Sequence, residues 1–63
     1  MNNVTLPTRP GAVLVSPDGK RAYILMPTGL WVGTYRGAST LPKHLQEVVN
    51  EEGYTVAFEG VSG

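Results

Sequence analysis

Apolar residues gather in four short stretches of the chain, at residues 12–16, 21–26, 30–35 and 54–58. The first is an almost unbroken apolar run that is rich in β-branched residues and too short for a helix. It predicts a strand buried on both faces, of the kind that lies inside a sheet rather than at its edge. The other three stretches alternate between two side-chain faces, as strands do. The pattern therefore predicts four strands.

This alternation assigns the side chains of the last three strands to faces. Both faces are apolar in the second strand, and in the third Gly33 separates two aromatic residues, where a missing side chain admits a bulge or a neighbouring ring. The predicted faces are Ala22, Ile24 and Met26 opposite Tyr23 and Leu25; Leu30, Val32 and Thr34 opposite Trp31, Gly33 and Tyr35; and Tyr54, Val56 and Phe58 together on one face.

Two matching turns separate the first three strands. Ser16-Pro17-Asp18-Gly19 and Met26-Pro27-Thr28-Gly29 each carry proline in the second position and glycine in the fourth. Proline presets φ for the second position of a type I turn, and glycine supplies the positive φ that a three-residue hairpin with a G1 bulge requires. The turns therefore predict a three-stranded antiparallel meander.

One helix is predicted between Thr40 and Glu52, where apolar residues recur at three- and four-residue spacing. Pro42 suits the first helical turn and leaves Leu41 at or beside the cap, although Ser39 and Thr40 are better capping residues.

The other end of this helix carries Gly53, which is expected to terminate it. Glu51 and Glu52 lie in the last turn, where negative charge opposes the helix dipole. That conflict predicts a cationic neighbour, with Lys20, Arg21 or a partner molecule as candidates.

The element order β-β-β-α-β predicts a small α+β fold, in which one helix packs on one face of an antiparallel sheet. Residues 1–63 form a single domain, with residues 1–10 as an extended N-terminal arm and residues 59–63 as a loose tail. A helix of about three turns cannot cover both faces of four strands. The uncovered face either curls into a partly closed barrel or meets another molecule. We expect it to carry Trp31 and Tyr35, with Tyr23 or Leu25.

Composition argues against a disulfide-linked, a thiolate-metal and a membrane-spanning protein. Sixty-three residues suffice for one small core, and a chain without cysteine has neither disulfides nor a thiolate metal site. No apolar run approaches the roughly 20 residues that span a bilayer, and the N-terminus lacks a basic region followed by an apolar stretch. We expect a soluble, unprocessed protein without a membrane partner.

Charge is segregated along the chain although the formal net charge is zero. All five basic residues lie within residues 1–43, where Asp18 is the one acidic residue, and the four glutamates lie within residues 44–63. Such a distribution either arises by chance on a small surface, or it steers a partner molecule or pairs two copies head to tail.

No residue pattern indicates catalysis, a cofactor or a metal ion. The single histidine, His44, lies on the flank of the predicted helix, where a solvated side chain is expected. The serines Ser16, Ser39 and Ser62 lie in turn or tail segments without a recognisable general base. One histidine with scattered glutamates lacks the ligand spacing of zinc or calcium sites. We therefore expect no catalytic, cofactor-binding or metal-binding residues.

The candidate interaction surface combines the uncovered sheet face with the arginines beside it: Tyr23, Leu25, Trp31, Tyr35, Arg21 and Arg36. Protein–protein contact is the leading hypothesis, with a second copy of the chain or with a larger target protein, because spare apolar sheet suits an interface. The alternative is a small nucleic-acid-binding domain whose aromatic residues stack on bases, although the zero net charge disfavours it. A purely structural role in an assembly and a purely core role for Trp31 also stay open.

Several short segments carry a resemblance to a known group of proteins. They are Leu6-Pro7-Thr8-Arg9-Pro10-Gly11-Ala12-Val13-Leu14, Trp31, Glu52-Gly53-Tyr54-Thr55-Val56 and Glu59-Gly60. In these segments the chain resembles small uncharacterised accessory proteins of actinobacteriophages, of the mycobacteriophage type. The position of Arg9 is often acidic in those proteins, and a serine often replaces Ala12. The resemblance implies a cytoplasmic accessory protein of a phage or prophage that modulates a host protein, and it supplies no active site.

Overall fold

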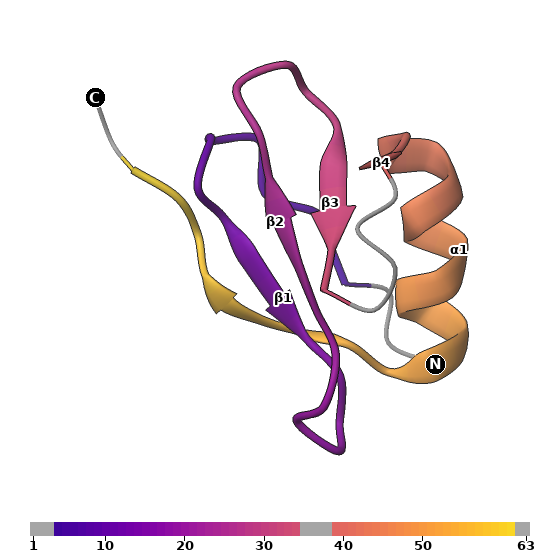
Figure 1. The fold of residues 1–63 in the computed structure, drawn as a ribbon. Helices are drawn as coiled ribbons and strands as arrows, with labels where there is room; N and C mark the ends of the chain where they lie inside the picture. The colour runs from indigo at the N-terminus through magenta and orange to yellow at the C-terminus, as the bar shows by residue number, and fades with distance from the viewer. Residues whose placement is uncertain (1–3, 35–38, 62–63) are drawn as a thin grey trace.

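The computed structural model describes residues 4–34 and 39–61. Its elements are β1 (Val13–Val15), β2 (Ala22–Leu25), β3 (Trp31–Gly33), β4 (Ser39–Thr40), α1 (Pro42–Glu52) and β5 (Thr55–Phe58). The strands form one five-stranded sheet in the order β4-β3-β2-β1-β5, and all neighbours are antiparallel. The helix α1 lies along one side of this sheet (Figure 1). The predicted α+β class is confirmed, and the sheet is open rather than closed into a barrel.

Both predicted hairpin turns are present. The Gly19 N–H donates to the carbonyl oxygen of Ser16, and the Gly29 N–H donates to that of Met26, each over 2.9 Å. The two glycines have φ values of 73° and 90°, which other residues rarely adopt. These turns place β1, β2 and β3 side by side as the predicted meander, and β1 lies inside the sheet between β2 and β5 as expected.

The helix begins within the predicted span of Thr40 to Glu52, with Pro42 in the first turn and Leu41 at the cap as the proline indicated. Leu41 occupies the N-cap position without a side-chain hydrogen bond. Ser39 and Thr40 do not cap α1 because they pair with β3 as the short strand β4, which the sequence did not predict. The C-terminal end agrees with the prediction, since Gly53 adopts a left-handed conformation and its N–H donates to the carbonyl oxygen of Val49.

The core lies between α1 and the sheet. Its fully buried side chains include Leu45 and Val49 of α1, and Trp31 of β3. The N-terminal arm covers the same side, because Val4 and Leu6 pack against this cluster. The buried apolar residues are Ala12, Leu14, Leu25, Trp31, Leu45, Val49 and Tyr54.

The predicted assignment of faces is therefore wrong for Trp31 and Leu25. These residues lie opposite one another in β3 and β2, and they are only 1% and 5% exposed. We expected them on the uncovered face, but α1 and the arm cover that side. Sequence alternation correctly separated the two faces of β2 and β3, but it did not determine which face the helix covers, because both faces are apolar.

A bulge also changes the face of one residue in β5. Leu14 pairs with Val56, whereas the neighbouring Val13 pairs with Phe58, so β5 contains one extra residue at this point. Phe58 consequently shares a face with Val13 and not with Val56, contrary to the predicted grouping of Tyr54, Val56 and Phe58. Its side chain is 51% exposed.

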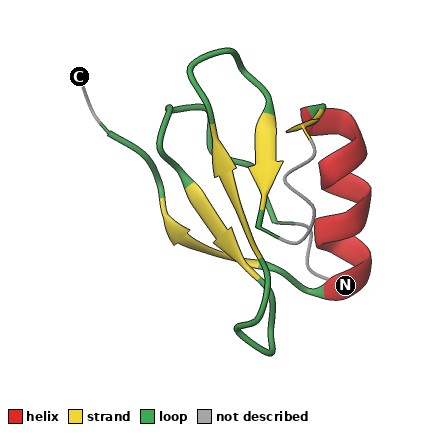
Figure 2. Cartoon of the chain, in the orientation of Figure 1, coloured by secondary structure: helices red, strands yellow, loops and turns green. Residues whose placement is uncertain are grey.

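The described part of the predicted loose tail is attached to the body of the protein. The Val61 N–H donates to the carbonyl oxygen of Pro10 over 3.0 Å. Nearby, a Cβ atom at Gly60 would lie 2.6 Å from the carbonyl oxygen of Arg9. Residues 59–61 thus continue past β5 alongside the chain that leads into β1, as the loop colouring of Figure 2 shows.

Candidate interaction surface

The face of the sheet opposite α1 is uncovered by any described element (Figure 1). Strand pairing places eight residues on it, six apolar and two small hydroxyl residues, and we call this set the open face. The open face consists of Val13, Val15, Ala22, Ile24, Val32, Ser39, Thr55 and Phe58. None of these residues is charged.

The open face is accessible both at its centre, where Ile24 lies between Val13 and Val32, and at its edge, where Phe58 lies in β5. Ile24 is 40% exposed and Phe58 is 51% exposed, and Met26, which follows β2, is 40% exposed. An antiparallel sheet with one face in water normally alternates apolar and polar residues. This sheet is apolar on both sides, so its uncovered side departs from that pattern and is a candidate interaction surface.

The predicted interaction residues do not form one surface. Trp31 and Leu25 are in the core, and Tyr35 and Arg36 lie outside the described residues. Tyr23 is half-buried on the helix side, where its ring lies over Gly33 and beside the ring of Tyr54, with 5.6 Å between the ring centroids. The predicted contact of an aromatic ring with the gap at Gly33 is therefore confirmed, and a buried Trp31 cannot stack on a base.

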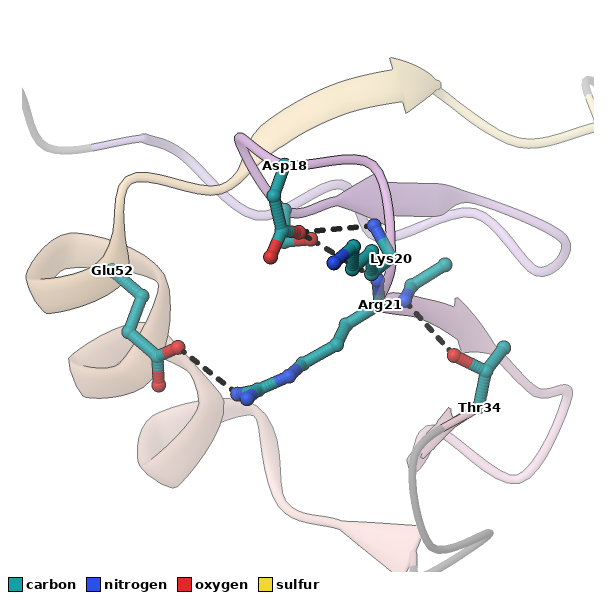
Figure 3. Close-up of polar contacts among 7 residues, drawn as sticks. Asp18, Lys20, Arg21, Thr34 and Glu52 are labelled. Carbon is teal, nitrogen blue, oxygen red and sulfur yellow. Dashed lines mark hydrogen bonds and ion pairs between the residues drawn. The ribbon is translucent and has the colours of Figure 1, made fainter.

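Arg21 provides the cationic neighbour that was predicted for the end of α1. Its Nη1 atom lies 3.3 Å from Oε1 of Glu52, and its side chain extends from the β1–β2 turn toward the last turn of the helix (Figure 3). Both side chains are nearly half exposed. The pair offsets the unfavourable position of Glu52 and connects the first hairpin to α1.

Asp18 organises the tip of the same hairpin. Its Oδ1 atom accepts hydrogen bonds from the Ser16 hydroxyl and from the Lys20 N–H, the latter over 2.9 Å (Figure 3). The Ser16 hydroxyl oxygen in turn accepts from the Arg21 N–H. These contacts, led by the Ser16 hydroxyl, lower the pKa of the Asp18 carboxyl below its usual value. These hydrogen bonds stabilise the hairpin turn. The Ser16 hydroxyl takes part in two of them, as donor to Asp18 and as acceptor from the Arg21 N–H.

A second candidate surface lies on the helix side of the sheet, where the sequence pattern did not predict a binding site. A cavity of about 640 Å³ opens between the N-terminal arm, the β2–β3 hairpin and the first turn of α1. It is lined by Thr5, Leu6, Pro7, Thr8, Leu25, Gly29, Trp31, Pro42, Lys43 and Gln46. The arm contributes four of these residues, and only folding brings them opposite α1.

Within residues 4–34 and 39–61 no group of three or more histidine, aspartate or glutamate side chains could hold a metal ion. His44 is exposed on α1, as expected. The described helix is too short and too polar to cross a membrane. Comparison of the chain with protein-family models, curated proteins and solved structures finds no match in any of the three.

Proposed function

We propose that this protein acts by binding rather than by catalysis, and that its open face is the surface on which two copies associate. The observation that carries the proposal is the uncharged, apolar character of the open face, with Ile24 and Phe58 left accessible. Two such faces meet without placing like charges together and without burying an unpaired charge.

The size of the molecule is compatible with this role. The molecule extends 31 × 24 × 21 Å, and the open face takes up one side of its sheet, so we expect it to bury at most the roughly 800 Å² per partner of a standard interface. Face-to-face packing of two sheets at about 10 Å is a common way to complete such a core. Interfaces of this size bind with micromolar or lower dissociation constants, so we expect a reversible dimer.

Salt dependence separates this arrangement from head-to-tail pairing of the basic and acidic parts of the chain. Contact through the open face involves no charge and should survive high ionic strength. Electrostatic head-to-tail pairing should weaken as salt screens the charges.

The test is light scattering behind size exclusion over roughly a hundredfold range of protein concentration. We expect a concentration-dependent dimer for the natural sequence and a folded monomer for Ile24→Lys, because a dimer would bury the new charge. Val61→Lys is the matched control: Val61 is 65% exposed and lies outside the sheet, so this variant should dimerise normally. A natural sequence that stays monomeric throughout, or an Ile24→Lys variant that still dimerises, would refute the proposal.

A cytoplasmic accessory role in a phage or prophage belongs to the same proposal. Its support is the resemblance of residues 6–14 and 52–56 to actinobacteriophage accessory proteins. Modulation of a host protein, if it occurs, would use this dimer or the open face of a dissociated copy. Fractionation of a cell that expresses the gene should place the protein with the cytoplasm, and recovery with the membrane fraction would contradict that assignment.

A further inference from the structure

The cavity beside the N-terminal arm is a second site, on the side of the sheet opposite the open face. Its volume of about 640 Å³ lies within the 300–1,000 Å³ range typical of small-molecule sites. One wall is the arm, which is held to α1 by a hydrogen bond of 2.7 Å from Gln46 Nε2 to the carbonyl oxygen of Val4. The same Gln46 nitrogen donates to Asn50 Oδ1 over 3.0 Å, which orients the amide.

We propose that this cavity binds a small amphipathic carboxylate, with its apolar body against Leu6, Pro7 and Pro42 and its anionic group at Lys43. Leu25 and Trp31 form the floor of the cavity, where they are only 5% and 1% exposed, so the accessible apolar walls are those of the arm and of the first helical turn. Such preformed apolar walls with few polar groups are typical of ligand sites.

The positive charge of Lys43 at the edge of the cavity favours an anionic ligand over a cationic one. Lys43 is exposed and is the one charged residue among the described residues that line the cavity. It takes no part in the ion pair between Arg21 and Glu52. The first turn of α1 contains no acidic side chain. Glu47 lies four residues further along α1, where a carboxylate can offset part of the charge of a lysine, so Lys43 offers a ligand the remainder. An ammonium ligand would meet repulsion here, whereas a carboxylate would gain an ion pair.

The test is titration of the ¹⁵N-labelled protein with octanoate, octan-1-ol and octylamine, monitored by NMR. Trp31 is the one tryptophan of the chain, so its indole N–H signal reports on the cavity without ambiguity. We expect saturable shifts of the Trp31 indole and Gln46 amide signals with octanoate, weaker binding of the alcohol and weakest binding of the amine.

Two lysine variants examine the role of charge. Lys43→Gln should weaken octanoate binding about two- to fivefold, as expected for a partly exposed ion pair, and leave octan-1-ol binding unchanged. Lys20→Gln, in the β1–β2 turn and outside the cavity, is the matched control and should bind octanoate normally. The Ile24→Lys variant should also bind normally, so failure of dimerisation and failure of ligand binding are separate results.

Several results would overturn the inference. Binding at the cavity is refuted if octanoate causes no saturable shifts, or if its shifts centre on Ile24 and Phe58 instead of Trp31. The role of the Lys43 charge is refuted if octan-1-ol binds as tightly as octanoate, or if Lys43→Gln and Lys20→Gln lose octanoate affinity equally.

Discussion

The packing of the Tyr23 ring over Gly33 makes a quantitative prediction. The two residues are directly opposed in β2 and β3, and a Cβ atom at Gly33 would lie 2.6 Å from Cε1 and 3.0 Å from Cδ1 of the ring. These are rigid ring atoms, and the ring also packs beside Tyr54. Gly33→Ala must therefore displace the ring, and we expect the free energy of unfolding to fall by about 1–3 kcal/mol, as for other overpacked sites.

The same substitution should have the opposite effect once the ring is removed. In a Tyr23→Ala background the space above Gly33 is empty, and alanine is favoured over glycine within a strand by about 0.5–1 kcal/mol because it restricts the unfolded chain. Gly33→Ala should then stabilise the protein. The coupling energy between the two positions is the difference between these effects, about 1.5–4 kcal/mol.

Urea denaturation of the four proteins of this double-mutant cycle measures the coupling energy, with circular dichroism and Trp31 fluorescence as probes. Protein concentration must be the same for all four, because dimerisation adds to apparent stability. If Gly33→Ala lowers the free energy of unfolding by the same amount with and without the Tyr23 ring, the proposed contact between the two residues is refuted.

Three further predictions concern the core and the first hairpin. Trp31→Ala should lower the free energy of unfolding by about 3–5 kcal/mol, measured by circular dichroism in urea, whereas a change of only a few tenths would contradict its core position. Asp18 has a lowered pKa in the folded state, so it stabilises the protein above its ordinary pKa of 3.8, and this contribution is lost as the pH falls through the lowered folded value. Asp18→Asn should therefore reduce the fall in stability below pH 3.8 in urea titrations, and an unchanged pH profile would contradict this. Glu52→Gln should cost less than about 1 kcal/mol and nothing in high salt, because its ion pair with Arg21 is nearly half exposed; a loss that persists in high salt would oppose this.

Local sequence signals predicted the turns, the strand segments and the end of the helix. Proline and glycine at fixed positions of each turn restrict φ directly, and Gly53 supplies the left-handed residue that ends α1. These features depend on neighbouring residues and need no knowledge of the sheet order. The Arg21–Glu52 contact joins residues far apart in sequence; the helix dipole predicted a cation beside Glu51 and Glu52, and the fold determined which of the candidates took that place.

The interaction surface was not predictable for three physical reasons. Both faces of β2 are apolar, so periodicity alone could not determine whether the Trp31 side or the Ile24 side receives the helix. The bulge opposite Val13 moves Phe58 to the open face, and no residue of β5 signals it. The cavity depends on the arm folding back to Gln46, a contact between residues far apart in sequence.

The most direct test of the central claim is an isotope-filtered nuclear Overhauser experiment on a mixture of labelled and unlabelled protein at a concentration that favours the dimer. The account predicts intermolecular contacts from the Ile24 methyl groups and the Phe58 ring to the same open face of the second copy. Intermolecular contacts that instead join the basic hairpin to the acidic end of α1, or a complete absence of contacts at the open face, would contradict it.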